Sequence, residues 1–201
     1  MEIGRALAGV EGRWVRYPQK SMISGADCDS RRVGRGFLFV AYRGDAADGH
    51  DYIDDVLRRG ASVIVAERRV PVPEGVGLYL VDDGRLAAAK IAANIHPRSQ
   101  DLTLIAVTGT AGKTTTTLLI RHILNSSSIP CAALTTIAYY TSEKPHPSEN
   151  TTPGPFRLHA LLEEAARNGH RACVMEVSSH AICQHRVEGL RFVCGLLTNI
   201  G

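Results

Sequence analysis

Residues 102–115 read LTLIAVTGTAGKTT, and this stretch decides the fold of the second half of the chain. The run at residues 102–107 is apolar and β-branched, which by its length predicts a buried β-strand. A glycine-rich turn from Gly109 to Gly112 follows, and the apolar pattern of residues 118–124 then predicts a helix. A strand that passes through such a turn into a helix is typical of a parallel α/β sheet.

The same alternation continues towards the end of the chain. Further strands are predicted at residues 131–134, 172–177 and 192–197. A proline-rich polar loop at residues 143–152 precedes a helix that Gly169 ends. Five apolar residues of this helix fall on one face at spacings i, i+3, i+4, i+7 and i+8, namely Leu158, Leu161, Leu162, Ala165 and Ala166.

The first half of the chain also mixes strands and helices. An amphipathic helix is predicted at residues 51–59 with Gly60 as its C-terminal cap, and an alanine-rich helix at residues 86–95 stops before Pro97. The polar joint at residues 97–101 marks the expected domain boundary. The strands predicted in this half are residues 37–41, 62–66 and 78–81. The two predicted domains are residues 1–98 and residues 99–201.

Composition excludes several classes of protein. Hydrophobic residues make up 44% and charged residues 21%, which is typical of a folded globular chain rather than a disordered one. The net charge is +3, and no cationic run with interleaved aromatic residues indicates nucleic-acid binding. The N-terminus lacks an apolar core of signal-peptide length, and no apolar run is long enough to cross a bilayer. We therefore expect a cytoplasmic protein.

The five cysteines form no CxxC pair and match no zinc pattern. Apart from Cys28, each lies in an apolar stretch, where a free thiol behaves as a small hydrophobic group. We therefore expect the other four to be reduced and buried, namely Cys131, Cys173, Cys183 and Cys194.

The glycine-rich turn has the chemistry of a phosphate-binding loop. Glycines let backbone N–H groups turn towards phosphate oxygens, and the helix N-terminus adds positive character. Lys113 supplies a charge for the β- and γ-phosphates, and the Thr114 hydroxyl can bind Mg²⁺. The common pattern has a glycine where this chain has Val107, so the loop is a variant, and the alternative is a glycine turn with a surface lysine. The predicted ATP-binding residues are Thr108, Gly109, Thr110, Ala111, Gly112, Lys113, Thr114 and Thr115.

Glu176 comes at the end of a strand that is predicted to be buried. Burying an unpaired carboxylate is costly, so a plain structural role is hard to assign to this residue. The carboxyl ends of strands are where α/β proteins place their ligands. There a carboxylate can share Mg²⁺ with Thr114 and the γ-phosphate, which makes Thr114 and Glu176 the expected metal ligands.

Four sequence blocks together resemble the Mur ligase family, most closely its UDP-N-acetylmuramoyl-tripeptide synthetase branch. The phosphate loop is close to the shortened loop of that family, although Ala111 stands where asparagine is usual. The last two blocks are the most specific for this branch. The blocks are residues 29–31 with 36–41, 44–49 and 50–53; residues 107–117; residues 149–153; and residues 175–186.

The resemblance implies roles for individual residues. Ser30 would lie against the uridine diphosphate group, and Lys113 and Glu176 would be catalytic. The residues implied to hold the muramoyl-dipeptide are Asn150, Thr151, Thr152, Ser178, Gln184 and Arg186.

Most of these residues also have a structural interpretation. Thr151 and Thr152 could start the helix after Pro153, because threonine is a common N-cap. Ser178 could be a loop hydroxyl, and Arg186 a solvated surface charge. Separately, His180 and His185 are expected to be polar or exposed residues, because their spacing fixes no metal geometry.

The resemblance further implies the reaction. ATP would phosphorylate the side-chain carboxylate of a D-glutamate, and the amine of a third amino acid, lysine or meso-diaminopimelate, would displace phosphate from the acyl phosphate. The expected ligands are ATP, Mg²⁺ and the UDP-N-acetylmuramoyl-dipeptide, bound by a monomer.

The resemblance breaks off at residues 198–201, before the histidine block, the adenine site and the C-terminal domain of the family. We therefore expect a truncated P-loop domain that is inactive alone, as a fragment, a truncated product or a degenerate copy. The alternatives are a non-catalytic nucleotide-binding module, a small P-loop kinase, and a ligase similar to folylpolyglutamate synthetase. The kinase would need a lid with phosphate-binding arginines, which the sequence does not suggest.

Overall fold

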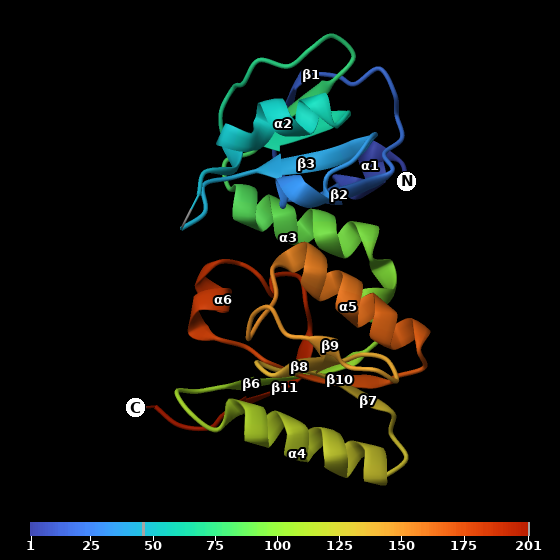
Figure 1. The fold of residues 1–201 in the computed structure, drawn as a ribbon, viewed down its shortest axis with the longest axis vertical. Helices are drawn as coiled ribbons and strands as arrows, with labels where there is room; N and C mark the ends of the chain where they lie inside the picture. Colours follow the sequence, from blue (N-terminus) through green and yellow to red (C-terminus); the bar gives the residue numbers. More distant parts are fainter. Residues whose placement is uncertain (46, 201) are drawn as a thin grey trace. The chain divides into compact units, whose positions relative to one another are not determined.

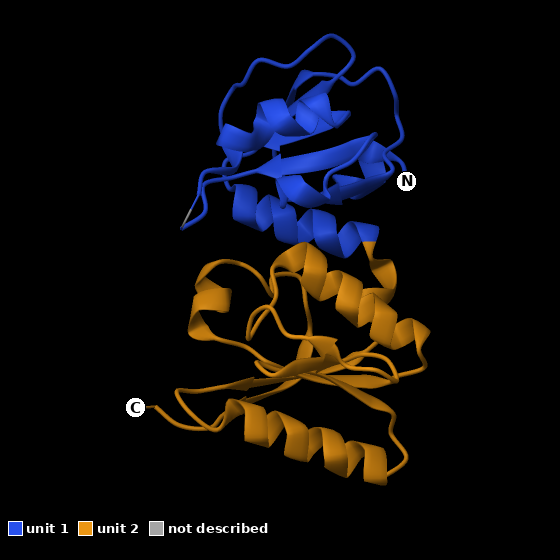
Figure 2. Cartoon of the chain, in the orientation of Figure 1, with its two compact units in different colours: residues 1–95 blue, residues 96–201 orange. Residues whose placement is uncertain are grey.

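A computed structural model describes residues 1–45 and 47–200 of the chain. The chain divides into two compact units, Met1–Ile95 and His96–Gly201, shown in different colours in Figure 2. Ala46, within the block at residues 44–49, and Gly201, the last residue of the expected second domain, lie outside the described residues. Each unit is an α/β structure, so the predicted fold class is confirmed.

Unit 1 is built on a five-stranded sheet with the order β1-β5-β4-β3-β2. Strand β1 runs antiparallel to β5, whereas the other neighbouring strands are parallel. Every residue of the central strand β4 is buried, which fits its run of branched side chains. The strands are β1 (Arg13–Arg16), β2 (Gly25–Asp27), β3 (Phe37–Ala41), β4 (Val63–Ala66) and β5 (Gly77–Leu80).

Helices cover both faces of this sheet (Figure 1). Val56 of α2 packs with Phe39 and Ile64 on one face, and α3 contacts β2 and β3. The predicted helix at residues 51–59 is a 3-10 turn followed by the short helix α2, and Gly60 has a φ of 89°, as a C-terminal glycine requires. The helices are α1 (Ile3–Ala6), η1 (Ser30–Arg32), η2 (Gly49–Tyr52), α2 (Ile53–Arg58) and α3 (Gly84–Ile95).

Unit 2 contains a six-stranded sheet with the order β11-β6-β10-β7-β8-β9. The first four strands in this order are parallel, and β8 and β9 add an antiparallel edge. The predicted strands at residues 131–134 and 192–197 coincide with β7 and β11. The strands are β6 (Thr103–Thr108), β7 (Cys131–Leu134), β8 (Ala138–Tyr140), β9 (His146–Pro147), β10 (Ala172–Glu176) and β11 (Phe192–Leu197).

Helices α4 (Lys113–Ser126) and α5 (Pro155–Arg167) lie on opposite faces of this sheet (Figure 1). All five residues of the predicted apolar face of α5 are buried, as expected. They pack on side chains of β6, β7 and β10 in a single core. The remaining helices of the unit are η3 (Pro97–Gln100) and α6 (Ser179–Cys183).

The cysteines differ partly from expectation. All five thiols are free, and Cys131 and Cys173 are buried in the sheet, where burial raises the pKa of Cys131 to about 11. Cys183 and Cys194 are exposed, so the prediction that they are buried is wrong. Cys194 lies on β11, an edge strand with largely exposed residues, and the apolar sequence around it gave no sign of that position. In addition, none of the helices in the described part of the chain has the length and apolar character to span a membrane.

Leu161 tests the core of unit 2. Its side chain is completely buried, so Leu161→Ala should reduce the free energy of unfolding by about 2–5 kcal/mol. Leu119 on α4 is 58% exposed, and Leu119→Ala should change it by less than about 0.5 kcal/mol. Chemical denaturation of both variants measures the difference, and equal effects would contradict the assigned packing of α5.

His159 tests the same core through its pH dependence. The imidazole is buried, its Nδ1 lies 2.8 Å from Ser99 Oγ, and burial lowers its pKa to about 4, with the charge of His96 contributing. The unfolded chain would take up this proton near pH 6.5, whereas the folded protein would not, so stability should fall as the pH drops from 6.5 to 4. The variant His159→Gln should lose less stability over this interval, and identical denaturation profiles would contradict the assignment.

Candidate active site

The predicted phosphate loop and Glu176 follow neighbouring parallel strands. β6 leads into the loop and β10 ends at Glu176, which is in register with Val107. Because both strands run in the same direction, their carboxyl ends lie at the same edge of the sheet. The structure therefore brings together two features that lie more than sixty positions apart in the sequence.

Glu176 is a fully buried carboxylate that accepts hydrogen bonds from neutral groups. Its Oε1 accepts bonds from Thr114 Oγ1 at 2.8 Å and from the Thr136 backbone N–H at 2.9 Å. Its Oε2 lies 3.0 Å from Thr136 Oγ1. Among the residues the structure describes, no lysine or arginine forms an ion pair with it. A buried charge held in this way favours an additional cationic partner.

Thr136 is a site residue that the sequence reasoning missed. It follows β7, the third parallel strand whose carboxyl end reaches this edge, and its Oγ1 also lies 3.0 Å from Thr151 Oγ1. A hydroxyl has a single proton, so Thr136 can donate to Glu176 while it accepts from Thr151. The end of β7 could have indicated this position, because the same strand-end argument singled out Glu176.

The phosphate loop has the backbone shape that its glycines allow. Gly109 has a φ of 132° and Gly112 a φ of 80°, values that residues with a side chain rarely adopt. Helix α4 begins at Lys113, whose ammonium group donates to the Gly109 carbonyl at 2.7 Å. The first N–H groups of a helix have no partner within it, so they remain available to an anion.

A pocket of about 440 Å³ opens beside this loop. Loop residues line it together with Ser178 and Ser179, which follow β10. Ser178 also caps α6, because its hydroxyl accepts a bond from the Ala181 N–H at 3.2 Å. One predicted substrate-binding residue thus shares a pocket with the predicted ATP-binding residues.

Thr152 ties the block at residues 149–153 to the end of β10. Its buried hydroxyl donates to the Glu176 carbonyl at 3.0 Å and accepts from the Ser178 N–H at 3.1 Å. Helix α5 has Gly154 as its N-cap, so neither Thr151 nor Thr152 starts this helix. The Thr152 side chain therefore supports the site from within the protein.

Arg186, Gln184 and Thr152 also lie together. Arg186 is half-buried and donates to the Thr152 carbonyl at 2.7 Å and to Gln184 Oε1 at 2.8 Å. Gln184 Nε2 lies 2.7 Å from His180 Nε2, and His180 is exposed, as expected. For Asn150, the backbone N–H and carbonyl both bond to the Tyr139 hydroxyl. The interpretation of Arg186 as a solvated charge is wrong.

The residues at this edge fit a divalent cation shared with phosphate. In the described part of the chain, no group of three or more His, Cys, Asp or Glu residues could hold a metal by itself. Mg²⁺ is commonly bound by one or two carboxylates together with substrate phosphates and water. Glu176 and Thr114, whose side-chain oxygens are 2.8 Å apart, offer such a partial set of ligands.

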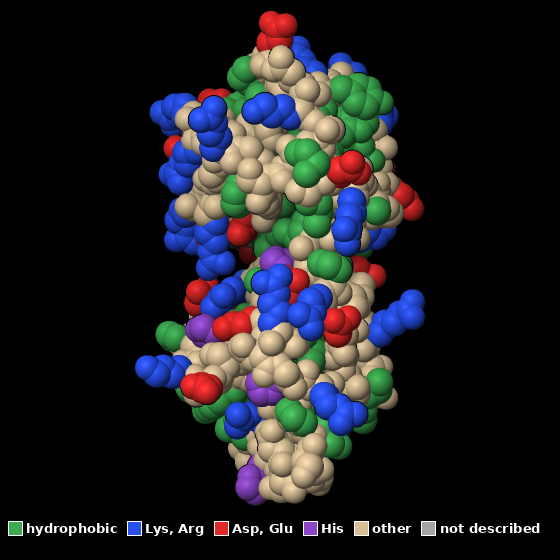
Figure 3. All heavy atoms as spheres, turned by 90° about the vertical axis from the view of Figure 1, so that its right-hand side faces the viewer, with side chains coloured by type: hydrophobic (Ala, Val, Ile, Leu, Met, Phe, Trp, Pro, Cys, Tyr) green, Lys and Arg blue, Asp and Glu red, His purple; other side chains and the backbone are tan. Residues whose placement is uncertain are grey.

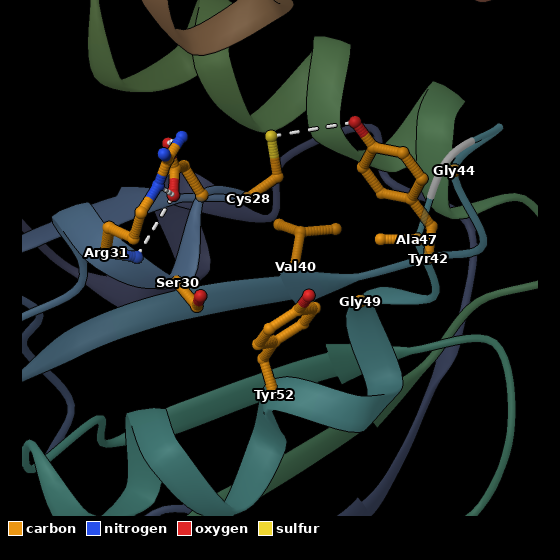
Figure 4. Close-up of a pocket in the computed structure, with 10 residues that line it drawn as sticks. Cys28, Ser30, Arg31, Val40, Tyr42, Gly44, Ala47, Gly49 and Tyr52 are labelled. Carbon is orange, nitrogen blue, oxygen red and sulfur yellow. Dashed lines mark hydrogen bonds and ion pairs between the residues drawn. The ribbon is translucent and has the colours of Figure 1, made fainter.

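Ser30 lines a separate pocket of about 490 Å³ in unit 1 (Figure 4). Tyr42 and Tyr52 lie on its rim with Cys28, whose Sγ accepts a bond from the Tyr42 hydroxyl at 3.6 Å. Burial raises the pKa of Cys28 to about 12, so its thiol stays neutral. Figure 3 shows Lys and Arg side chains gathered along one edge of unit 1, whereas acidic and basic side chains are interspersed over unit 2.

Thr136 provides a direct test of the Glu176 network. The variant Thr136→Val keeps the shape of the side chain but removes the hydroxyl, so the Oε2 atom of Glu176 loses a donor. We expect a loss of about 1–3 kcal/mol in the free energy of unfolding. The variant Thr136→Ser retains the hydroxyl and should lose less. Denaturation curves for the two variants measure the effect, and a valine variant as stable as the serine variant would contradict the network.

The structural and sequence comparisons agree on one family. The profile of the Mur ligase family catalytic domain matches residues 22–110, and that of the Mur ligase middle domain matches residues 107–201. The chain is 44% identical over 179 residues to the UDP-N-acetylmuramoyl-L-alanyl-D-glutamate–2,6-diaminopimelate ligase of Geobacter metallireducens, a match that covers 89% of this chain and 35% of the relative. The curated relatives are much longer, and the matches cover between 35% and 42% of their length.

Two solved structures illustrate the shared fold. A UDP-N-acetylmuramoyl-L-alanyl-D-glutamate–2,6-diaminopimelate ligase matches with a TM-score of 0.81 at 24% identity, covering 100% of this chain and 40% of that one. The MurF ligase of Thermotoga maritima in complex with ADP matches with a TM-score of 0.51 at 27% identity, covering 77% of this chain and 32% of that one. Because the two Mur ligase profiles together match residues 22–201, the chain belongs to the Mur ligase family.

Proposed function

We propose that this chain forms the ATP-phosphate-binding and UDP-substrate-binding part of an ATP-dependent ligase. The whole enzyme would add the third amino acid to UDP-N-acetylmuramoyl-L-alanyl-D-glutamate by way of an acyl phosphate. The observation that carries the proposal is the position of a buried carboxylate, Glu176, within hydrogen-bond distance of Thr114 in the phosphate loop. The 44% identity to a ligase that is named for this substrate supports it.

The phosphate loop would bind the β- and γ-phosphates of ATP. The first N–H groups of α4 and its dipole provide a neutral but electropositive cradle. The Lys113 ammonium group now bonds to the Gly109 carbonyl at 2.7 Å and would exchange this acceptor for phosphate oxygens. This movement is short, because the side chain already lies over the loop. Positioning and charge neutralisation are the main contributions of such a loop to phosphoryl transfer.

Glu176 and Thr114 would hold Mg²⁺ beside the γ-phosphate. When bound, the ion would offset the negative charge that develops during phosphoryl transfer. Thr114 would offer its hydroxyl oxygen to the ion, and the hydrogen bonds from Thr136 hold the carboxylate of Glu176.

The muramoyl-dipeptide would bind where the block at residues 149–153 meets the turn after β10. Arg186 provides a positive charge there, held by the Thr152 carbonyl and by Gln184. The carboxylate of D-glutamate would attack the γ-phosphorus of ATP, which breaks the bond to ADP and leaves an acyl phosphate. An amine can displace phosphate from this species, whereas a free carboxylate is a poor acyl donor. In this assignment Asn150, Thr151, Ser178, Gln184 and Arg186 contact the substrate, and Thr152 supports them.

The uridine diphosphate group would occupy the Ser30 pocket of unit 1. A hydroxyl and two tyrosine rings at one pocket suit a ligand with an anionic and a planar part. The named relative uses 2,6-diaminopimelate as amine donor, and we extend this to the whole enzyme. We further propose that the protein is a monomer and that it is cytoplasmic, since the cytoplasm contains ATP and the proposed nucleotide-linked substrate.

Titration calorimetry tests this function on the chain itself. Wild-type protein should bind both Mg-ATP and the UDP-muramoyl-dipeptide, whereas a non-catalytic nucleotide-binding module would bind ATP alone. Lys113→Ala should abolish ATP binding and leave binding of the UDP-linked ligand intact. Lys144 is an exposed lysine of the same unit outside the site, and Lys144→Ala serves as the control with unchanged binding. Unchanged ATP affinity in Lys113→Ala would overturn the assignment of the loop.

A further inference from the structure

The first half of the phosphate loop is bound by the segment that follows β11. The Asn199 side-chain oxygen, Oδ1, accepts hydrogen bonds from two consecutive backbone N–H groups, those of Thr110 at 2.9 Å and Ala111 at 3.0 Å. One oxygen thus accepts from both donors, although 88 positions separate Ala111 from Asn199 in the sequence. The Thr110 N–H also lies 3.4 Å from the Asn199 backbone carbonyl oxygen. These two N–H groups have a partner without any nucleotide.

Thr198 holds the same part of the loop from the other side. Its N–H donates to the Thr108 carbonyl at 2.9 Å, and its hydroxyl lies 2.6 Å from the Ala111 carbonyl. A Cβ atom on Gly109 would overlap the Thr198 hydroxyl. The glycine at this position is therefore required by the close approach of the segment after β11, besides any approach of phosphate.

The loop consequently has two functionally different halves. The N–H groups of Thr110 and Ala111 are bound to Asn199, whereas those from Lys113 onward begin helix α4 and lack partners within it. Phosphate oxygens would use the second set. The direction in which the N–H groups at the start of α4 point depends on the path of the backbone through Thr110 and Ala111, because only Gly112 separates Ala111 from Lys113.

We propose that Asn199 is a positioning residue of the ATP-phosphate site. Its carboxamide oxygen fixes the backbone at Thr110 and Ala111, so that the N–H groups at the start of α4 face the phosphates before nucleotide arrives. Such preorganisation increases affinity because the loop loses less conformational freedom on binding. The inference rests on the proposed binding of ATP by this loop and adds a residue that contacts the loop from the segment after β11.

The experiment compares Asn199→Leu, which has a similar size but no acceptor, with Asn199→Asp, which keeps an acceptor at the same distance. Amide hydrogen exchange without nucleotide should become faster at Thr110 and Ala111 in the leucine variant. The aspartate variant should restore the slow exchange, because a carboxylate oxygen can accept both bonds. A purely structural role elsewhere in the unit would not confine the change to these two amides.

Calorimetric titration with Mg-ATP gives the second readout. The dissociation constant should rise on the order of tenfold or more in Asn199→Leu, as expected when a bonded pair of donors loses its acceptor. Chemical denaturation should show that unit 2, which contains Asn199, is still folded in this variant. Asn125 is a matched control, because its side chain bridges backbone groups of Arg121 and Cys131 in the same unit. The variant Asn125→Ala should lower stability without changing the affinity for ATP.

The outcomes separate the possible failures. Unchanged exchange at Thr110 and Ala111 in Asn199→Leu would overturn the inference. Tighter binding of ATP in that variant would also overturn it, since the side chain would then compete with phosphate. If wild-type protein binds no Mg-ATP while Asn199 still protects the two amides, the proposed function fails, and with it the role of Asn199 towards nucleotide.

Discussion

The site depends on the burial of one carboxylate. Glu176 has no exposed surface, and the donors that reach it are neutral groups from two other segments, the start of α4 and the turn after β7. Removing a charge from water costs several kcal/mol unless hydrogen bonds or a counter-ion replace the water. These segments must therefore meet at one point whenever the unit folds. The same arrangement leaves the carboxylate able to accept a divalent cation, so the requirement for stability and the requirement for chemistry coincide.

The parallel sheet makes this meeting possible. β6, β10 and β7 are adjacent and run in the same direction, so the phosphate loop, Glu176 and Thr136 lie at one edge of the sheet. A fourth segment, residues 149–153, is joined to the end of β10 by the hydrogen bond from the Thr152 hydroxyl to the Glu176 carbonyl. Each connection contributes one or two hydrogen bonds to this geometry. Residues that are far apart in the sequence are thus linked by hydrogen bonds at this edge, although no short motif contains them.

The sequence predicted those parts of the fold that depend on local patterns. The buried face of α5 and the ends of β7 and β11 follow from periodicity and from β-branched runs, and the structure confirms them. The short strands β8 and β9 were missed, because two or three residues provide no periodic signal. The burial of Cys194 was predicted wrongly, because an apolar strand reads the same whether it lies inside a sheet or at its edge.

The site residues also divide into those that local sequence patterns predicted and those that they did not. Glu176 and the phosphate loop were predicted because each combines a residue type with a strand end. The roles of Thr136 and Asn199 depend on contacts across 40 and 88 positions, respectively, which no spacing in the sequence indicates. For Thr152, the threonine was singled out, but its hydroxyl bonds within the protein at the end of β10.

The contacts of the phosphate loop explain why it lacks the glycine that the common pattern has at position 107. Val107 stands where the common pattern has glycine, and it is fully buried within β6, with its carbonyl accepting a bond from the Val177 N–H. The strand therefore continues further than in the common pattern, and fewer residues remain to turn the chain into α4. A shorter loop has fewer internal bonds to define its path, and the segment after β11 supplies them from outside through Thr198 and Asn199. Hydrogen bonds thus join the loop to the segment after β11, and a change in either should alter the backbone at the N-terminus of α4.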